Sequence, residues 1–194
     1  MNRTTAIVFG VAGVLALSGS ALHAVSEPAY YDPSAFIDYL AVVSLTTIFV
    51  VTGVALVLLW RDPPVRRGSL FLLLAGIGAA AVGLGNLFED AFDVEAAVWV
   101  FFGGGLLMLV SLPIAGIAAL TVHSPRRWSG LFLLFAAPGA ILGFGFVMMG
   151  VSWILFGLWI VYQHRAFVIA IAVAAVPALA TVFYLYGDDV FFGV

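Results

Sequence analysis

Long apolar stretches, separated by short charged segments, run along almost the whole chain. Uncharged stretches cover residues 4–26, 39–60, 68–88, 96–125, 128–164 and 166–187. A membrane-spanning helix needs about 20 predominantly apolar residues, and all of these stretches except 128–164 suit a single crossing. The pattern therefore predicts an all-α integral membrane protein, folded as one polytopic helical bundle over residues 1–194.

The stretch 128–164 is too long for one crossing. As a single helix it would measure roughly 55 Å, against a hydrocarbon core of about 30 Å. Two short spans with a turn near Met148, Met149 and Gly150 fit better. Seven transmembrane helices are therefore predicted, with six as the alternative, over residues 4–26, 39–60, 68–88, 96–122, 129–147, 150–164 and 166–187.

The composition supports a membrane protein. Hydrophobic residues make up 64% of the chain and charged residues only 9%, whereas soluble domains carry about 25% charged residues. The chain has no cysteine, which excludes disulfides, thiolate metal sites and thiol catalysis. No nucleic-acid partner is predicted, because the net charge is −3 and no nucleic-acid-binding motif is present. P-loop, dinucleotide-binding and Ser-His-Asp signatures are also absent from the sequence.

Basic and acidic residues fall in alternate connections. With seven spans and the N-terminus inside, all seven arginines are cytoplasmic and nine of the ten acids lie on the opposite side, as the positive-inside rule expects. The predicted localisation is the cell membrane of a prokaryote, with a cytoplasmic N-terminus and the C-terminus outside. The prokaryotic source is inferred from the absence of lysine and the richness in Ala, Gly and Val. The predicted partners are the lipid bilayer and anionic headgroups near Arg61, Arg66, Arg67, Arg126 and Arg127.

The first apolar stretch has two interpretations. Arg3, an apolar run over residues 6–17 and small residues ending at Ala21 are typical of a secretory signal peptide over residues 1–21. The segment 4–26 is also long enough to cross a bilayer. We favour a retained helix, and cleavage would leave six spans with the same orientation.

Small residues recur at four-residue spacing within several predicted spans. Such stripes let helix backbones approach closely, which drives helix association in a bilayer where burial of apolar surface alone does not. We therefore predict interhelical seams at Ala12, Ala16 and Ser20, at Ala75, Ala79 and Gly83, and at Gly139 and Gly143.

Two segments 60 residues apart resemble each other. RRGSLFLLLAGIGAAAVGLG begins at Arg66 and RRWSGLFLLFAAPGAILGFG begins at Arg126. Both place a serine, an LFLL core and a G-x-G after two arginines. The likeness suggests tandem repeats of a two-helix hairpin, spans two and three followed by four and five, although abundant Leu, Gly and Ala also produce such likeness by chance.

Acidic residues cluster in the segment GNLFEDAFDVE, which begins at Gly85. We interpret it as a solvated outer turn between the third and fourth spans, because burying four carboxylates in hydrocarbon would be costly. The alternative is a divalent metal at the outer face, since carboxylates and histidine are suitable ligands. Its candidate ligands are His23, Glu27, Glu89, Asp90 and Asp93. Otherwise no cofactor is predicted.

Glycine and proline within the spans have two interpretations, which are close helix packing with a kink, the one we favour, and a path for a ligand. Transporters use interrupted helices to expose backbone groups to a substrate. Three consecutive glycines lie in the fourth span, a Pro-Gly pair follows in the fifth, and Asn86 is the most polar group near a span interior. The candidate residues for such a path are Gly103, Gly104, Gly105, Ser111, Pro138 and Asn86.

No Asp, Glu, Lys or Arg falls deep within a predicted span. Ion-coupled carriers and proton pumps usually need such a residue. The neutral Thr46, Thr47 and Thr52 of the second span are expected to bond their own helix backbone.

The leading hypothesis is therefore a non-enzymatic membrane protein. It would be an accessory or lipid-facing subunit, or a permease-like component for an uncharged or lipidic ligand, with a membrane-protein partner or a second copy of itself. The alternatives are a membrane-embedded, metal-dependent enzyme with the outer acidic and histidine site, and a facilitator or channel beside the three glycines.

Overall fold

The computed structural model describes residues 3–25, 36–137 and 144–162, and the part so described contains helices and no strand. The α-helices and the two shorter helical segments are α1 (Arg3–Val25), α2 (Phe36–Arg61), α3 (Ser69–Asn86), the π-helix η1 (Leu87–Ala91), α4 (Ala97–Leu120), the 3₁₀-helix η2 (Pro125–Trp128), α5 (Ser129–Ala136) and α6 (Phe144–Tyr162). The prediction of an all-α chain is thus confirmed.

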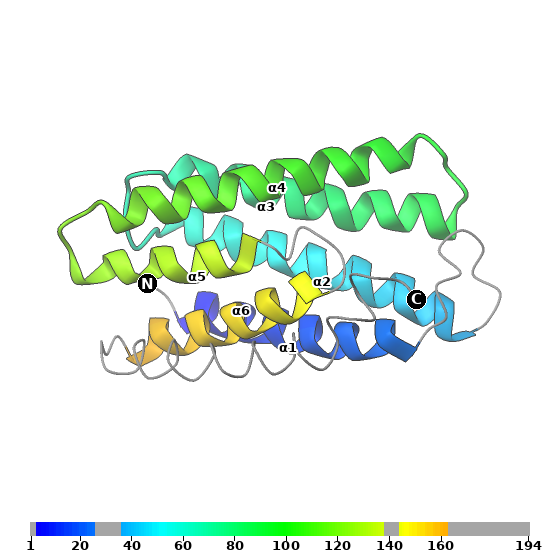
Figure 1. Cartoon of the computed structure of the whole chain (residues 1–194), viewed down its shortest axis with the longest axis horizontal. Coiled ribbons are helices and arrows are strands. Elements are labelled where there is room, and N and C mark those ends of the chain that lie inside the picture. Colours follow the sequence, from blue (N-terminus) through cyan, green and yellow to red (C-terminus); the bar gives the residue numbers. More distant parts are fainter. Residues whose placement is uncertain (1–2, 26–35, 138–143, 163–194) are drawn as a thin grey trace, which may run out of the picture.

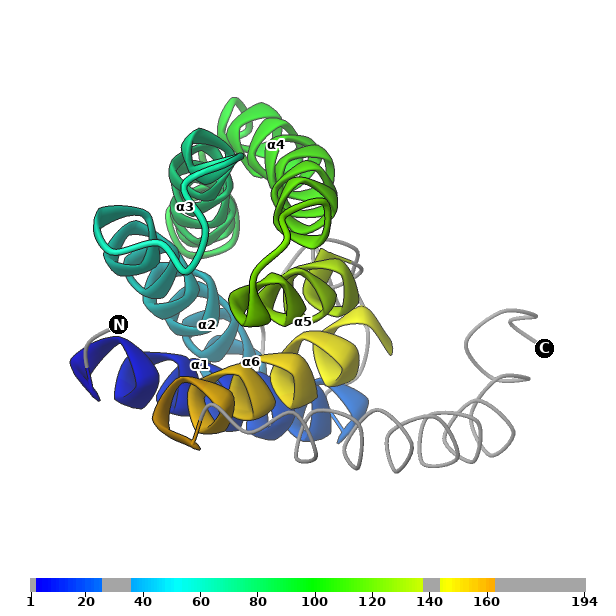
Figure 2. The ribbon, with the colours of Figure 1, turned by 90° about the vertical axis from the view of Figure 1, so that its left-hand side faces the viewer.

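The six α-helices close into a ring. Each helix packs against the next one along the chain, and α6 returns to pack against α1. Figure 1 shows the helices lying side by side along one axis, and the view along this axis in Figure 2 shows them arranged around it. Their buried apolar side chains form one continuous core, to which every α-helix contributes.

Four of the helices are long and apolar enough to cross a membrane: Arg3–Ser20, Tyr39–Arg61, Ser69–Ala91 and Ala97–Leu120. The apolar part of α6, Val147–Val161, is shorter. α5 has only eight residues, or about 12 Å at 1.5 Å per residue. Within the described part of the chain the count reaches six helices, and the predicted seventh span, 166–187, lies outside it.

The prediction for residues 129–164 placed the turn wrongly. Met149 and Gly150 lie inside α6, where both are buried, and the first helix of this pair already ends at Ala136. Pro138, which lacks a backbone N–H, follows Ala137, the last residue that the structure describes in this segment. The boundaries 129–147 and 150–164 are therefore corrected to Ser129–Ala136 and Phe144–Tyr162.

Glycines bring the helix backbones into contact. A Cβ added to Gly78 of α3 would lie 2.7 Å from the carbonyl oxygen of Gly104 in α4, and one added to Gly104 would lie 2.6 Å from the oxygen of Gly78. We call such a couple a reciprocal glycine pair. Three more such pairs occur among the described residues: Gly13/Gly150 between α1 and α6, Gly53/Gly76 between α2 and α3, and Gly116/Gly130 between α4 and α5.

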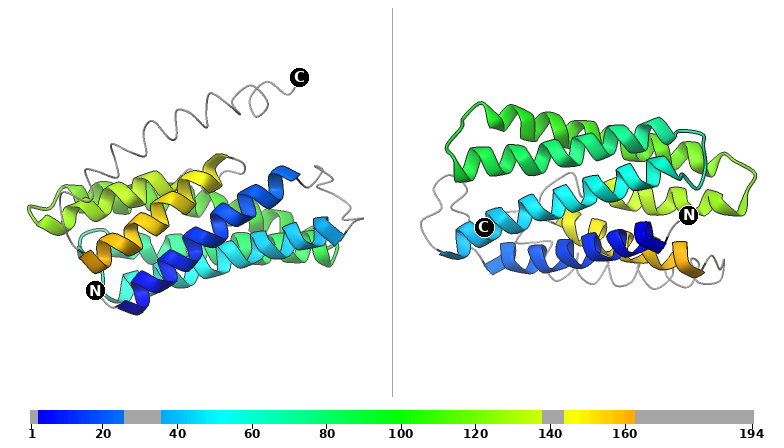
Figure 3. Two further views of the ribbon diagram at one scale, coloured as in Figure 1. Left: turned by 90° about the horizontal axis from the view of Figure 1, so that it is seen from below. Right: turned by 180° about the vertical axis from the view of Figure 1, so that it is seen from behind.

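The predicted small-residue seams on α1 and α3 are confirmed in their main feature. Ala12 and Ala16 are buried in α1, and Ala75, Ala79 and Gly83 are buried in α3. The left view of Figure 3, seen from below, shows α1 and α6 lying side by side, in agreement with their glycine contacts. The third predicted seam, Gly139 and Gly143, lies outside the described residues.

Candidate functional site

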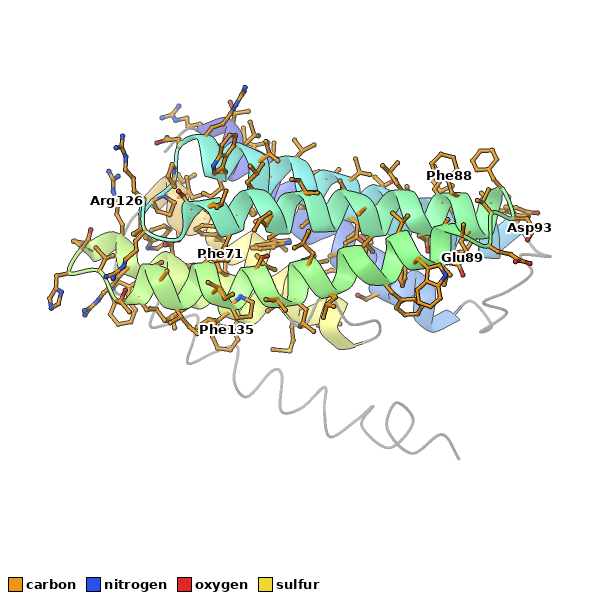
Figure 4. All side chains as sticks on the ribbon, turned by 90° about the horizontal axis from the view of Figure 1, so that it is seen from above. Phe71, Phe88, Glu89, Asp93, Arg126 and Phe135 are labelled. Atoms are coloured by element: carbon orange, nitrogen blue, oxygen red, sulfur yellow. The ribbon has the colours of Figure 1, made fainter. Side chains whose placement is uncertain are left out.

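Charge separates to the two ends of the bundle. Figure 4 shows Arg126 at one end and Glu89 and Asp93 at the other. The topology explains the separation, because Arg66, Arg67, Arg126 and Arg127 lie in the α2–α3 and α4–α5 connections, whereas Glu89, Asp90, Asp93 and Glu95 lie between α3 and α4. The sequence prediction of a basic and an acidic edge is thus matched by the positions of the connections.

The acidic end is built on an irregular helix terminus. η1 continues α3 as one π-helical turn that carries Glu89 and Asp90, both partly buried. The chain then leaves the helix at Asp93, whose φ of 54° is in the left-handed region and whose N–H donates to the carbonyl of Glu89 at 3.1 Å. Asp93 is exposed. The segment is therefore a partly solvated turn at the acidic end of the bundle, in agreement with the predicted solvated turn between the third and fourth spans.

The structure brings only part of the predicted metal-ligand set together. Glu89, Asp90 and Asp93 belong to the same turn, whereas Glu27 and the side chain of His23 lie outside the described part. Among the described residues, no three His, Asp or Glu side chains lie close enough to hold one metal ion. The divalent metal at the outer face stays a prediction.

Asn86 ties α3 to α2. Its side-chain Nδ2 donates to the carbonyl oxygen of Val42 and to Oγ1 of Thr46, both at 3.2 Å. The residue is only 4% exposed. Because both α2 partners lie on one face of that helix, the contact fixes the register of the two helices, and the amide N–H groups are directed at protein atoms.

The glycine-rich part of α4 is not interrupted. The helix runs from Ala97 to Leu120 through Gly103, Gly104 and Gly105 and through Pro113. The interrupted helix that these glycines suggested is therefore absent from α4, because Gly104 serves instead to bring the backbone against Gly78. A Cβ on Gly103 would meet no atom within 4 Å, so this glycine faces outward.

Of the other two candidates for a ligand path, Ser111 and Pro138, only the first belongs to the described residues. Ser111 is buried in α4, with 2% of its surface exposed. Pro138 lies outside the described residues. The path that these residues were predicted to line stays a prediction.

Three buried polar atoms have no hydrogen-bond partner among the described residues: Oγ1 of Thr52, Oγ of Ser129 and Nε1 of Trp153. All three side chains are fully enclosed. The threonine was expected to bond its own helix, as Thr47 does to the carbonyl of Val43 at 2.7 Å, and that expectation is wrong for Thr52. The sequence offered a signal for only one of these atoms, Nε1 of Trp153. This tryptophan lies in the middle of an apolar helix, whereas tryptophan in membrane proteins is enriched at the interfaces.

Aromatic rings surround the indole of Trp153. Its ring centroid lies 5.0 Å from that of Phe9 in α1 and 6.4 Å from that of Phe156 in α6. Phe132 of α5 stacks on Phe156 with a centroid separation of 5.4 Å. The unpaired N–H therefore belongs to an aromatic cluster in which α1, α5 and α6 meet.

No protein-family model matches the chain, and no curated protein or solved structure matches it either.

Proposed function

We propose that the chain is a non-enzymatic, multi-pass membrane protein whose helix ring takes up an uncharged or lipidic ligand. The observation that supports this proposal is a set of enclosed polar atoms with no hydrogen-bond partner in the described part of the chain, Thr52 Oγ1, Ser129 Oγ and Trp153 Nε1. A buried polar group without a hydrogen bond costs about 1–3 kcal/mol in proteins. Such a group is favoured where a bound molecule supplies the missing partner.

The chemistry of these groups sets the ligand class. Two hydroxyls and an indole N–H donate to carbonyl, ester, ether or hydroxyl oxygens, and the surrounding core is apolar. The buried polar side chains of the described part are all neutral: Thr5, Thr52, Asn86, Ser111, Ser129 and Ser152. An uncharged amphipathic molecule therefore suits this interior better than an ion does.

The test compares two threonines of α2. Thr52→Val removes the unpaired hydroxyl with little change of shape, whereas Thr47→Val removes a hydroxyl that bonds its own helix. Small neutral molecules extracted with the purified protein would be identified by mass spectrometry. We expect a specific uncharged species that is depleted in Thr52→Val and retained in Thr47→Val. A Thr52→Val protein that is only more stable, with unchanged extracted species, would contradict the proposal.

A further part of the proposal is the layout in the membrane. We propose seven spans, with residues 166–187 as the last, and the arginine-rich connections in the cytoplasm of a prokaryotic cell. The positive-inside rule supports this orientation. Single cysteines at the exposed Ala91 and Thr121 report opposite ends of α4, and one at Val190 reports the C-terminus. The Ala91→Cys and Val190→Cys variants should react with an impermeant maleimide in intact cells, and the Thr121→Cys variant should react only after lysis.

A further inference from the structure

The two arginine-rich connections lie together at one end of the bundle. Gly68 precedes the first residue of α3, and a Cβ built on it would lie 2.6 Å from the Cβ of Ala118 and 3.5 Å from the Cα of Ala115, both near the end of α4. The backbone next to Arg66 and Arg67 is therefore in contact with the helix that leads into the connection carrying Arg126 and Arg127. The end-on view of Figure 2 shows both connections on the same face of the ring.

Each connection has a defined conformation. In the first, Gly68 has a φ of 80° and the N–H of Ser69 donates to the carbonyl of Arg66 at 3.1 Å. In the second, η2 is capped by Ser124, whose carbonyl accepts from the N–H of Arg127 at 3.0 Å. The guanidinium groups thus start from fixed backbone positions rather than from loose loops.

The charge at this end is strongly positive. Arg61, Arg66, Arg67 and Arg126 are exposed and Arg127 is partly exposed. Asp62 is the one acid in the two connections. Guanidinium groups present several N–H donors in a plane and suit phosphate oxygens better than a point charge does.

Apolar side chains lie next to the arginines, at the ends of the helices that the two connections join. The guanidinium of Arg127 lies 5.0 Å from the ring centroid of Trp128, an arrangement that holds a cation beside an aromatic face. Trp60 and Leu70, next to the first connection, are 37% and 59% exposed. Tryptophan and arginine side by side at the end of an apolar helix are typical of the headgroup region of a bilayer.

We propose that residues 61–68 and 121–128 together bind the headgroup of an anionic phospholipid, with the phosphate between the two pairs of adjacent arginines and the acyl chains along the exposed apolar faces. Leu70, in the first turn of α3, and Ile117, in the last turn of α4, are both exposed. They offer the acyl chains of the lipid an apolar surface next to the two connections. A lipid is favoured over a free phosphate because the apolar surface adjoins the cationic one. The site is separate from the ring interior and does not depend on the ligand proposed there.

The test measures binding of two short-chain lipids to the full-length protein in neutral detergent, by native mass spectrometry. The probes are dioctanoyl phosphatidylglycerol and dioctanoyl phosphatidylcholine. For the unchanged protein we expect the anionic lipid to bind at least tenfold more tightly. In the variant with Arg66→Gln and Arg126→Gln, one arginine is removed from each connection, and the preference should fall to less than threefold.

Two further variants separate a built site from general positive charge. Arg3→Gln removes a basic residue from α1, which packs against α2 and α6 rather than against α3 or α4, so the preference should be kept. Gly68→Ala keeps every charge but forces the two connections apart, so the preference should fall. A helical circular-dichroism spectrum shows that each variant has folded, and the arginine variants carry the test if Gly68→Ala does not fold.

Three results would overturn the proposal. The first is equal binding of the two lipids by the unchanged protein. The second is a loss in Arg3→Gln that is as large as half the loss in the double variant, which would indicate an effect of net charge alone. The third is full displacement of the anionic lipid by an equal concentration of inorganic phosphate, which would assign the site to a free anion.

Discussion

The helices α3 and α5 begin alike and end differently. Both start at a serine shortly after two arginines, Ser69 and Ser129, and both continue with an LFLL core. α3 then runs for 18 residues and continues into η1, whereas α5 stops after eight. In the aligned sequences Gly78 of α3 stands where the second segment has Pro138.

The longer helix makes its contacts through backbone on two faces. Gly76 and Gly83, seven residues apart, approach α2, while Gly78 and Gly85 approach α4. Seven residues are almost two helical turns, so each couple lies on one face. α3 is therefore flanked on both sides by close backbone contacts along most of its length.

The shorter helix makes its contacts with α6 through side chains. The hydroxyl of Ser152 in α6 donates to the carbonyl of Phe132 at 2.5 Å, and Phe132 stacks on Phe156. Among the described residues of α5, a reciprocal glycine pair occurs only toward α4, at Gly130. The comparison indicates that substitutions at the packed glycines of α3 should destabilise the protein most. The position of α5 against α6 depends instead on side-chain contacts.

The largest expected effect is that of Gly78→Leu. A side chain at this position meets the carbonyl oxygen of Gly104 and the backbone nitrogen of Met108, which lie 2.7 and 2.9 Å from the added Cβ and cannot move independently. We expect a loss of about 3 kcal/mol or more, since overpacking commonly costs 1–3 and here involves backbone. Unfolding in mixed detergent micelles, followed by circular dichroism, measures it.

The matched control is Gly103→Leu, because a Cβ there meets no atom within 4 Å. Its stability should be unchanged or slightly higher, since leucine is the better helix former by somewhat under about 1 kcal/mol. Equal losses in the two variants would show that close packing of α3 against α4 does not govern stability.

The next effect in size tests the side-chain contacts of α5. Phe132→Leu removes the stacking on Phe156, and we expect a loss of about 1.5 kcal/mol, below the 3–5 of a complete Phe→Ala truncation. Phe135→Leu on the same helix is the control, because Phe135 is 41% exposed and should cost little. Figure 4 shows where Phe135 lies on the bundle. The same unfolding assay applies, and a larger loss at Phe135 would reverse the assignment of faces.

Residue patterns predicted the membrane class, the basic and acidic ends and the buried stripe Ala75, Ala79 and Gly83 of α3, because these depend on local periodicity. They failed at Met149 and Gly150, where the turn was placed by length alone, because both residues lie inside α6. The span predicted over 96–122 corresponds to the continuous α4, and only the alternative of a helix interrupted at Gly103 is wrong. One sequence cannot distinguish a glycine that packs from one that breaks a helix, because the difference depends on which neighbour faces it.

The candidate site was less predictable than the fold. The carboxylates around Glu89 were placed correctly in a partly solvated turn between two helices, but the bond from Asn86 to Thr46 joins residues 40 positions apart and follows from helix pairing alone. The unpaired hydroxyl of Thr52 could not be foreseen either, since most buried threonines in helices bond their own backbone.

Asn86→Leu tests the polar contact at the end of α3. It removes two donors to α2 with little change of volume, and we expect a loss of about 1 kcal/mol, within the range of interhelical hydrogen bonds in membranes. Thr121→Val is the control, because this hydroxyl bonds only its own helix at Ala118. A loss in Asn86→Leu that matches Gly78→Leu would mean that polar contacts hold α3 as firmly as backbone packing does.

The smallest expected effect is that of Ser152→Ala in α6. The variant removes the bond to Phe132, and interhelical hydrogen bonds in membrane proteins average about 0.6 kcal/mol, so we expect a loss of that order. Ser20→Ala is the control, since its hydroxyl bonds Ala16 in the same helix at 2.8 Å. Combining Ser152→Ala with Phe132→Leu sharpens the comparison. If the two losses add, the hydrogen bond and the stacking hold α5 independently, and a combined loss no larger than that of Phe132→Leu alone would show that the ring positions the carbonyl that Ser152 bonds. The short α5 would then depend on one side chain where α3 depends on four glycines.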